Sequence, residues 1–166
     1  MTTLEKAIFL ATRIHGNQTY GIFPYMYHIK EVLDIAIDLN LSENIQIACV
    51  LHDAIEDGGL SYNDIKDNFG TTVAEIVYAV TDGLGRNRSE RKSSTYAKIR
   101  KLRAAKIVKL CDRIANVTFG IETNSNKRRM YKKEHSVFKV ELEYIIEKDP
   151  DVLIVWDKLN TLINSI

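Results

Sequence analysis

Two histidines and two aspartates stand at positions that the helical pattern of the sequence would bury. His28 lies one turn before Val32 on the apolar face of a predicted helix, and His52 and Asp53 interrupt the apolar stripe of the next helix. Asp112 interrupts a third apolar stripe far along the chain. A buried carboxylate beside an imidazole is unfavourable without a counter-charge, which a divalent cation supplies. These four residues therefore predict a metal site, with a purely structural polar network as the alternative.

The donor types narrow the choice of metal. Two imidazoles and two carboxylates suit manganese, iron or zinc better than calcium, and water would fill the open coordination positions. The motif HDAIED then places Glu56 four residues after His52 and Asp57 four residues after Asp53. Residues four apart share a helix face, and a carboxylate near a metal can accept a proton from water. Glu56 and Asp57 are thus candidate catalytic acids. The alternative, acids at the end of a helix near a loop, would oppose the helix macrodipole.

Charge is unevenly distributed along the chain, although the formal net charge is only +1. Residues 1–85 carry 4 basic and 12 acidic side chains, residues 86–113 carry 11 basic and 2 acidic, and residues 114–166 carry 8 of each. Such asymmetry indicates an acidic metal site and an anionic partner, or else a solvated basic face. A non-enzymatic nucleic-acid-binding module is a further alternative, but no DNA-reading motif is visible.

The elements that must position these residues are helices. Two prolines and eight glycines in 166 residues favour long helices, and no stretch shows convincing strand alternation. Thr2 with Glu5 and Ser61 with Asp64 have the spacing of capping boxes. Residues 83–94 are either a loop or the frayed start of a helix. We expect an all-α domain of about seven to nine helices, at about 4–15, 25–39, 43–56, 61–70, 72–80, 96–103, 104–117, 127–147 and 151–163.

Composition excludes several protein classes. The chain is 45% hydrophobic and 27% charged, which excludes a disordered chain, a disulfide scaffold and a collagen-like repeat. Cys49 and Cys111 lie in helical patterns without metal spacing, so we expect buried, reduced thiols. The sequence lacks a signal peptide and any apolar run that could span a membrane, which predicts a cytoplasmic protein. We expect one domain over residues 1–166.

The ordered motifs resemble the HD superfamily of metal-dependent phosphohydrolases, and in particular the hydrolase domain of RelA/SpoT-type enzymes and the small alarmone hydrolases. The resemblance covers about residues 4–120, followed by C-terminal helices at about 127–163. It rests on HGNQ at 15–18, PYMYH at 24–28, LHDAIED at 51–57, FG at 69–70, VTDG at 80–83, ERK at 90–92 and VKLCDRIAN at 108–116.

This resemblance implies a manganese-dependent enzyme that removes the 3′-pyrophosphate of (p)ppGpp, leaving GDP or GTP. It implies metal ligation by His28, His52, Asp53 and Asp112, with Glu56 and Asp57 orienting or deprotonating water. It also implies that a small polyphosphorylated nucleotide is the partner, whose charge arginine and lysine would neutralise. Neither a membrane nor a nucleic acid is expected as a partner. The predicted substrate contacts are Tyr20, Arg91, Lys92, Lys109, Asn116, Tyr131 and Lys132.

One departure from the family pattern concerns the base. Where relatives usually carry Arg-Lys after the glutamine of the first motif, this chain has Thr19 and Tyr20, and the loop is about one residue shorter. Tyr20 could stack on a base. The alternative substrates are an adenine alarmone, a nucleoside triphosphate or NADPH.

Overall fold

The computed structural model describes residues 1–143 and 149–166 of the chain. These residues form nine α-helices and one two-stranded hairpin, which confirms the all-α expectation. The helices are α1 (Thr3–His15), α2 (Tyr25–Asp38), α3 (Glu43–Leu51), α4 (Tyr62–Phe69), α5 (Thr71–Val80), α6 (Arg88–Ile99), α7 (Arg103–Glu122), α8 (Asn126–Glu143) and α9 (Pro150–Asn164). Within the described residues, none of the helices combines the length and apolarity that a bilayer crossing requires.

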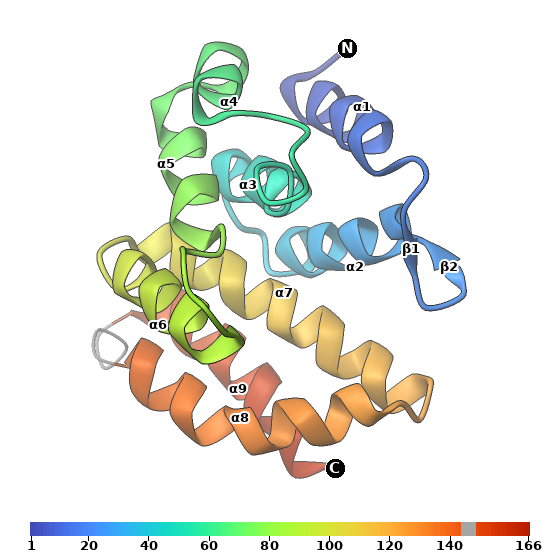
Figure 1. Ribbon diagram of the computed structural model, residues 1–166, viewed down its shortest axis with the longest axis vertical. Helices are drawn as coiled ribbons and strands as arrows, with labels where there is room; N and C mark the ends of the chain where they lie inside the picture. The colour runs from blue at the N-terminus through green and yellow to red at the C-terminus, as the bar shows by residue number, and fades with distance from the viewer. Residues whose placement is uncertain (144–148) are drawn as a thin grey trace.

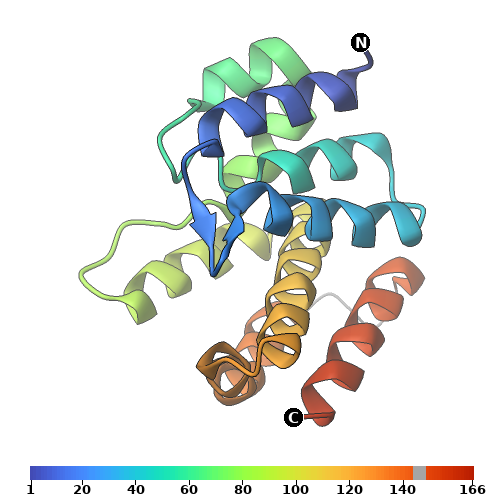
Figure 2. The same cartoon turned by 90° about the vertical axis from the view of Figure 1, so that its right-hand side faces the viewer.

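Helix α7 is the central element of the bundle. Its 20 residues pack against α2, α3 and α5 along one side, and against α6, α8 and α9 along the other (Figure 1). The view turned by 90° shows α8 beside the second half of α7 (Figure 2). The two-stranded hairpin, which joins α1 to α2, projects from the bundle in the same view. Because α7 touches both groups of helices, a residue on α7 can meet side chains from both halves of the sequence.

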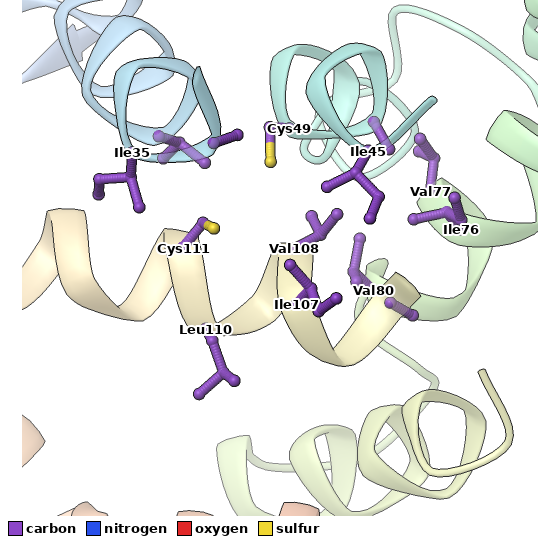
Figure 3. Packing of buried hydrophobic residues seen from close by; sticks show 14 of the residues in the cluster. Ile35, Ile45, Cys49, Ile76, Val77, Val80, Ile107, Val108, Leu110 and Cys111 are labelled. Carbon is purple, nitrogen blue, oxygen red and sulfur yellow. The ribbon is translucent and has the colours of Figure 1, made fainter. Parts of the chain in front are cut away.

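The core between α2, α3, α5 and α7 is mainly apolar. Ile107 and Val108 of α7 lie beside Ile76 and Val77 of α5 and Ile45 of α3 (Figure 3). All five side chains are buried. The sulfur atoms of Cys49 on α3 and Cys111 on α7 point toward one another across this core, and both thiols are free and buried. The expectation of buried, reduced cysteines is confirmed for this structure.

Local sequence signals set several helix ends. Both predicted capping boxes are present: the Thr2 and Ser61 side chains each accept from the backbone N–H three residues on, and Glu5 and Asp64 return the bond. Each satisfies backbone donors that a helix start leaves free. Gly70 then adopts a φ of +88° between α4 and α5, a conformation that glycine allows at little cost.

The predicted helix over 43–56 is too long, because α3 ends at Leu51. The chain continues as tight turns, in which the N–H of Ala54 donates to the carbonyl of Leu51 and the N–H of Asp57 to that of Asp53. His52, at the C-cap, still has helical backbone angles, φ −58° and ψ −31°. The helix therefore stops before the two acids, and turns rather than a continuous helix face position Glu56 and Asp57.

Three other boundaries also differ from the prediction. A hairpin pairs β1 (Thr19–Tyr20) with β2 (Phe23–Pro24), two residues each, which is too short for strand alternation to register. Helix α6 runs over Arg88–Ile99 rather than 96–103, so residues 88–94 are a helix start, the second of the two predicted alternatives. Asn87 caps its first turn by accepting from the N–H of Glu90. Helix α7 runs to Glu122 rather than 117. The predicted helix end at 147 lies outside the described residues.

Candidate metal centre

Three side chains bring metal-binding atoms to one place. His28 comes from the first turn of α2, while His52 is the C-cap of α3 and Asp53 follows it. One ligand atom from each lies within 4.8 Å of the other two. Both imidazoles are buried, and the Asp53 side chain is 23% exposed. The group is therefore a buried cluster that opens toward solvent on the side of Asp53.

Asp112 of α7 completes the arrangement. Its Oδ1 lies 3.3 Å from Nε2 of His28 and 3.8 Å from Nε2 of His52, and its Oδ2 accepts from the Lys109 ammonium at 2.7 Å. The Asn116 amide donates to Oδ1 at 2.5 Å. The structure thus brings together all four residues predicted as ligands, with one carboxylate oxygen of Asp112 held by a lysine.

The ring nitrogen of His52 and the carboxylate oxygen of Asp53 that could ligate a metal face each other at a distance that suits a shared cation. Nδ1 of His52 donates to the carbonyl of Cys49 at 2.8 Å, which leaves Nε2 as an acceptor in the neutral ring. That Nε2 is buried without a hydrogen bond in the described part of the chain, yet Oδ2 of Asp53 is only 2.9 Å away. Two lone pairs at this distance need a positive charge between or beside them. The residues present therefore fit a divalent metal.

Electrostatics in the cluster favour positive charge. Burial disfavours protonated His52, but Asp53 and Asp112 outweigh it and raise the pKa of His52 to about 9. Burial likewise opposes ionised Asp112, yet Lys109 and the two histidines hold its pKa well below the usual range. The carboxylates of Asp53 and Asp112 are therefore ionised at neutral pH. Their negative charge attracts a cation, either a proton on His52 or a metal ion.

A second layer of polar residues supports the cluster. The Tyr25 hydroxyl donates to Oδ2 of Asp53, and the Tyr25 ring packs 4.8 Å from the ring of His15. Sequence reasoning did not single out Tyr25, although it lies within the motif PYMYH. Such outer partners orient metal ligands and tune their basicity.

The two candidate catalytic acids occupy different surroundings. Glu56 lines the cleft above the cluster and accepts from the backbone N–H of Asp82 at 3.3 Å. Burial and the nearby Asp82 carboxylate raise the pKa of Glu56. Asp57 instead lies 3.2 Å from Nδ1 of the buried His15, and it is not among the residues that line the cleft. Of the pair, Glu56 lines the cleft and Asp57 does not.

The cleft has a volume of about 390 Å³, and five of the residues that line it are cations, which we call the rim: Arg88, Lys92, Lys109, Arg113 and Lys127. Lys109, Asn116 and Tyr131 line it as predicted, and so does Lys92, whose ammonium pairs with Asp82 at 3.0 Å. Three rim cations that were not predicted as substrate contacts are Arg88, Arg113 and Lys127. Most of the rim therefore comes from the basic segment 86–113, and it faces the acidic cluster that the first half of the chain supplies.

Two predicted contacts lie elsewhere. Arg91 does not line the cleft, since on α6 the residues Arg88 and Lys92, four apart, share the face that does. Lys132 lines a different hollow on the far side of α8, while Lys127 and Tyr131 occupy the cleft side of the same helix. The exact helical phase decides these positions, and it was not fixed by the sequence pattern.

Tyr20 lines the cleft but is bound within the protein. Its hydroxyl donates to Oδ1 of Asn116 at 2.7 Å, and its ring stacks on His28 with centroids 4.8 Å apart. Phe119 covers another part of the ring at 4.3 Å, and the Lys127 ammonium lies 4.2 Å from the ring centroid. Tyr20 is accordingly 6% exposed, so it forms the cleft wall beside the cluster.

Comparison with known proteins agrees with this geometry. A family model described as "HD domain" matches residues 7–140. A guanosine-3′,5′-bis(diphosphate) 3′-pyrophosphohydrolase of Aquifex aeolicus is 31% identical over 137 residues, and the bifunctional (p)ppGpp synthase/hydrolase SpoT of Escherichia coli is 31% identical over 140. Each alignment covers 79% of this chain and 20% of the relative, so the chain spans about a fifth of the curated relatives' length.

Two solved structures share the fold. One, described as a metazoan ortholog of SpoT that hydrolyses ppGpp, superposes with a TM-score of 0.79 at 22% identity, covering 99% of this chain and 96% of that one. The other, lmo0812 from Listeria monocytogenes, superposes with a TM-score of 0.65 at 25% identity, covering 84% and 98%. The first match shows that the whole helical arrangement, including α8 and α9, recurs in a known fold.

Proposed function

This chain belongs to the HD domain family, and on that basis we propose that it hydrolyses the 3′-pyrophosphate of guanosine alarmones, converting (p)ppGpp to GDP or GTP and pyrophosphate. The observation that carries the proposal is the cluster of His28, His52 and Asp53 against Asp112, set below a rim of cations. The curated relatives named for this reaction supply the substrate class.

The proposed ligands are His28, His52, Asp53 and Asp112, and the proposed metal is Mn²⁺. When bound there, a divalent cation would polarise a phosphoryl oxygen and lower the pKa of water. Glu56 would accept the proton of the attacking water, because its carboxylate lines the cleft above the ligands. Asp57, paired with His15, would hold the adjoining turn in place.

The rim would bind the phosphates. Arg88, Lys92 and Lys127 line the same cleft as the cluster and would neutralise the charge of the substrate. Arg88 and Arg113 both pair with Glu134, at 3.0 and 3.1 Å, and Lys92 pairs with Asp82 at 3.0 Å. A bound phosphate would therefore compete with these carboxylates for the three cations. A substrate carrying two diphosphates matches a rim of five cations better than a singly phosphorylated compound does.

The direct test follows turnover of ppGpp by the purified chain with Mn²⁺, measuring GDP and pyrophosphate. We expect turnover that a chelator abolishes and Mn²⁺ restores. Absence of any product at stoichiometric enzyme would refute the proposal.

A second candidate, hydrolysis of a different nucleotide, is favoured by Tyr20. Relatives usually have a basic pair at Thr19 and Tyr20, whereas here the Tyr20 ring is enclosed by His28, Phe119 and Lys127. The wall that would meet the base thus differs from the family pattern. A panel of ppGpp, an adenine alarmone, a nucleoside triphosphate and NADPH separates the two candidates. We expect the highest kcat/KM for ppGpp, and a preference for another member would establish the alternative.

Replacing Tyr25 with phenylalanine tests the support of the ligand cluster. The change removes the hydroxyl that donates to Asp53 and keeps the ring that packs on His15. We expect Mn²⁺ affinity to fall roughly 10- to 100-fold, as is typical when an outer partner of a metal ligand is lost. Isothermal titration with Mn²⁺ measures it. Tyr27→Phe is the matched control, since its ring stacks on Phe23, away from the ligands. Equal affinities in the two variants would show that the Tyr25 hydroxyl has no such role.

A further inference from the structure

Helix α8 presents basic residues on two faces. Lys127 and Tyr131, four residues apart, line the cleft of the metal cluster. Arg128, Arg129, Lys132 and Lys133 instead line a separate hollow of about 400 Å³, together with Ile121 of α7 and residues 165–166. The two sets of lining residues have no member in common. The second hollow is therefore a distinct surface, with α8 as the wall between it and the cleft.

No side-chain carboxylate pairs with the four cations of this hollow in the described residues. In the part of the chain that the structure describes, no carboxylate lies within ion-pairing distance of Arg128, Arg129, Lys132 or Lys133. Other arginines of the same surface region are paired, since Arg88 and Arg113 share Glu134 and Arg100 pairs with Glu141. The fold thus supplies acids to neighbouring cations but not to these four.

The position of the cations in the helix adds to the repulsion. Arg128 and Lys132, like Arg129 and Lys133, are four residues apart, where like charges destabilise a helix. They lie in the first two turns of α8, which carry no acidic residue in the first turn and where the helix dipole is positive. Because each of these features disfavours the unliganded state, an external anion would relieve all of them together.

The hollow is also held in shape by backbone packing. A Cβ on Gly120 of α7 would lie 2.8 Å from the backbone nitrogen of Arg128, so the two helices approach as closely as glycine allows. Ile121, next to it, gives the hollow an apolar wall between the charged side chains. A volume of about 400 Å³ falls within the usual range for small-molecule sites.

We propose that this hollow is a second ligand site, which binds a small molecule carrying two or more linked phosphate groups. Arginine offers paired donors that match phosphate oxygens, and lysine adds compact charge. Ile121 leaves room for an apolar group such as a nucleobase. The site is independent of the metal cluster, so it goes beyond the proposed hydrolase activity.

The test measures binding by isothermal titration in chelator at about 0.15 M salt, conditions that leave surface charges only partly screened. The probes are inorganic tripolyphosphate, GDP and ADP, titrated into the wild-type chain and into the double variant Arg128→Gln/Lys132→Gln. We expect one bound ligand per chain and at least tenfold weaker binding in the variant. Tighter binding of the nucleotides than of tripolyphosphate would identify a nucleotide as the ligand; the reverse would identify a condensed phosphate.

The matched control removes two cations from the other side of α8. Arg88→Gln/Lys127→Gln changes the rim of the cleft and should leave the measured affinity within twofold of the wild type. Loss of binding in this control, but not in Arg128→Gln/Lys132→Gln, would place the anion in the cleft and overturn the proposal. A second result would also overturn the proposal. If a single-stranded oligonucleotide bound more tightly than all three probes, and its affinity rose with its length, the hollow would be part of a nucleic-acid-binding surface. No turnover is measured, so failure here leaves the hydrolase proposal untouched.

Discussion

Asp53→Ala is expected to abolish both hydrolysis and Mn²⁺ binding while leaving the helical content intact. Asp53 contributes one of three ligand atoms that lie within 4.8 Å of each other, and its oxygen stands 2.9 Å from Nε2 of His52. Without it, the two imidazoles retain only Asp112, one of whose oxygens Lys109 already holds. We expect turnover to fall by at least four orders of magnitude.

Thermal unfolding provides a readout that does not depend on turnover. A ligand present at about 100 times its Kd stabilises the folded state by about 2.7 kcal/mol, which corresponds to roughly 5–10 °C in a chain of this size. Saturating Mn²⁺ should raise the midpoint of the wild type by this amount and leave that of Asp53→Ala unchanged. Without metal the variant should be somewhat less stable than the wild type, because, against the cost of burial, His52 and the Tyr25 hydroxyl hold the pKa of Asp53 below its ordinary range, so the ionised carboxylate stabilises the folded state at neutral pH.

The matched control for this experiment is Asp67→Ala, an exposed acid on α4. It removes the same charge far from the cluster and should keep wild-type turnover and the Mn²⁺-dependent shift. If Asp53→Ala retained either property, the assignment of the ligands would be wrong.

Helical periodicity predicted most of the fold because the long helices bury wide apolar stripes. The apolar stripe that Asp112 interrupts located α7, and the two capping boxes located the starts of α1 and α4. Helical periodicity could not distinguish a helix from turns that have helical backbone angles. In the segment HDAIED the spacing of apolar and polar residues still follows the helical pattern, but α3 ends at Leu51 and the chain continues as turns.

The candidate site was predictable where chemistry alone selects residues. Imidazoles and carboxylates on apolar faces stand out because burying them is costly, and all four proposed ligands were found in this way. Rim residues carry no such signal, since an arginine in a solvated loop and one at a cleft look alike in sequence. Arg88 rather than Arg91, and Lys127 rather than Lys132, face the cleft because of helix phase, which only the packing of α6 and α8 against α7 sets.

Glu56→Gln is expected to reduce kcat by about 100- to 10,000-fold, the usual contribution of a general base, with Mn²⁺ affinity unchanged. The amide keeps the size of the side chain and can still accept from the backbone N–H of Asp82, so the fold has no reason to change. It cannot accept a proton from water. Steady-state kinetics at saturating Mn²⁺ measure the loss, and Glu43→Gln, an exposed acid in the first turn of α3, is the matched control.

The pH dependence of kcat gives this prediction its sharpest form. A general base must be ionised, so the rate should fall as pH drops through the pKa of Glu56. Burial and the Asp82 carboxylate raise that pKa, so the acid limb of the wild-type profile should lie above the ordinary range of a glutamate. In Glu56→Gln the residual rate should lose this limb, whereas Glu56→Asp, which keeps a shorter carboxylate, should retain it and recover part of the rate. If the pH profile of Glu56→Gln kept the same acid limb, the proton transfer would belong to another group. Glutamine does not titrate, so a limb that survives this substitution cannot come from residue 56.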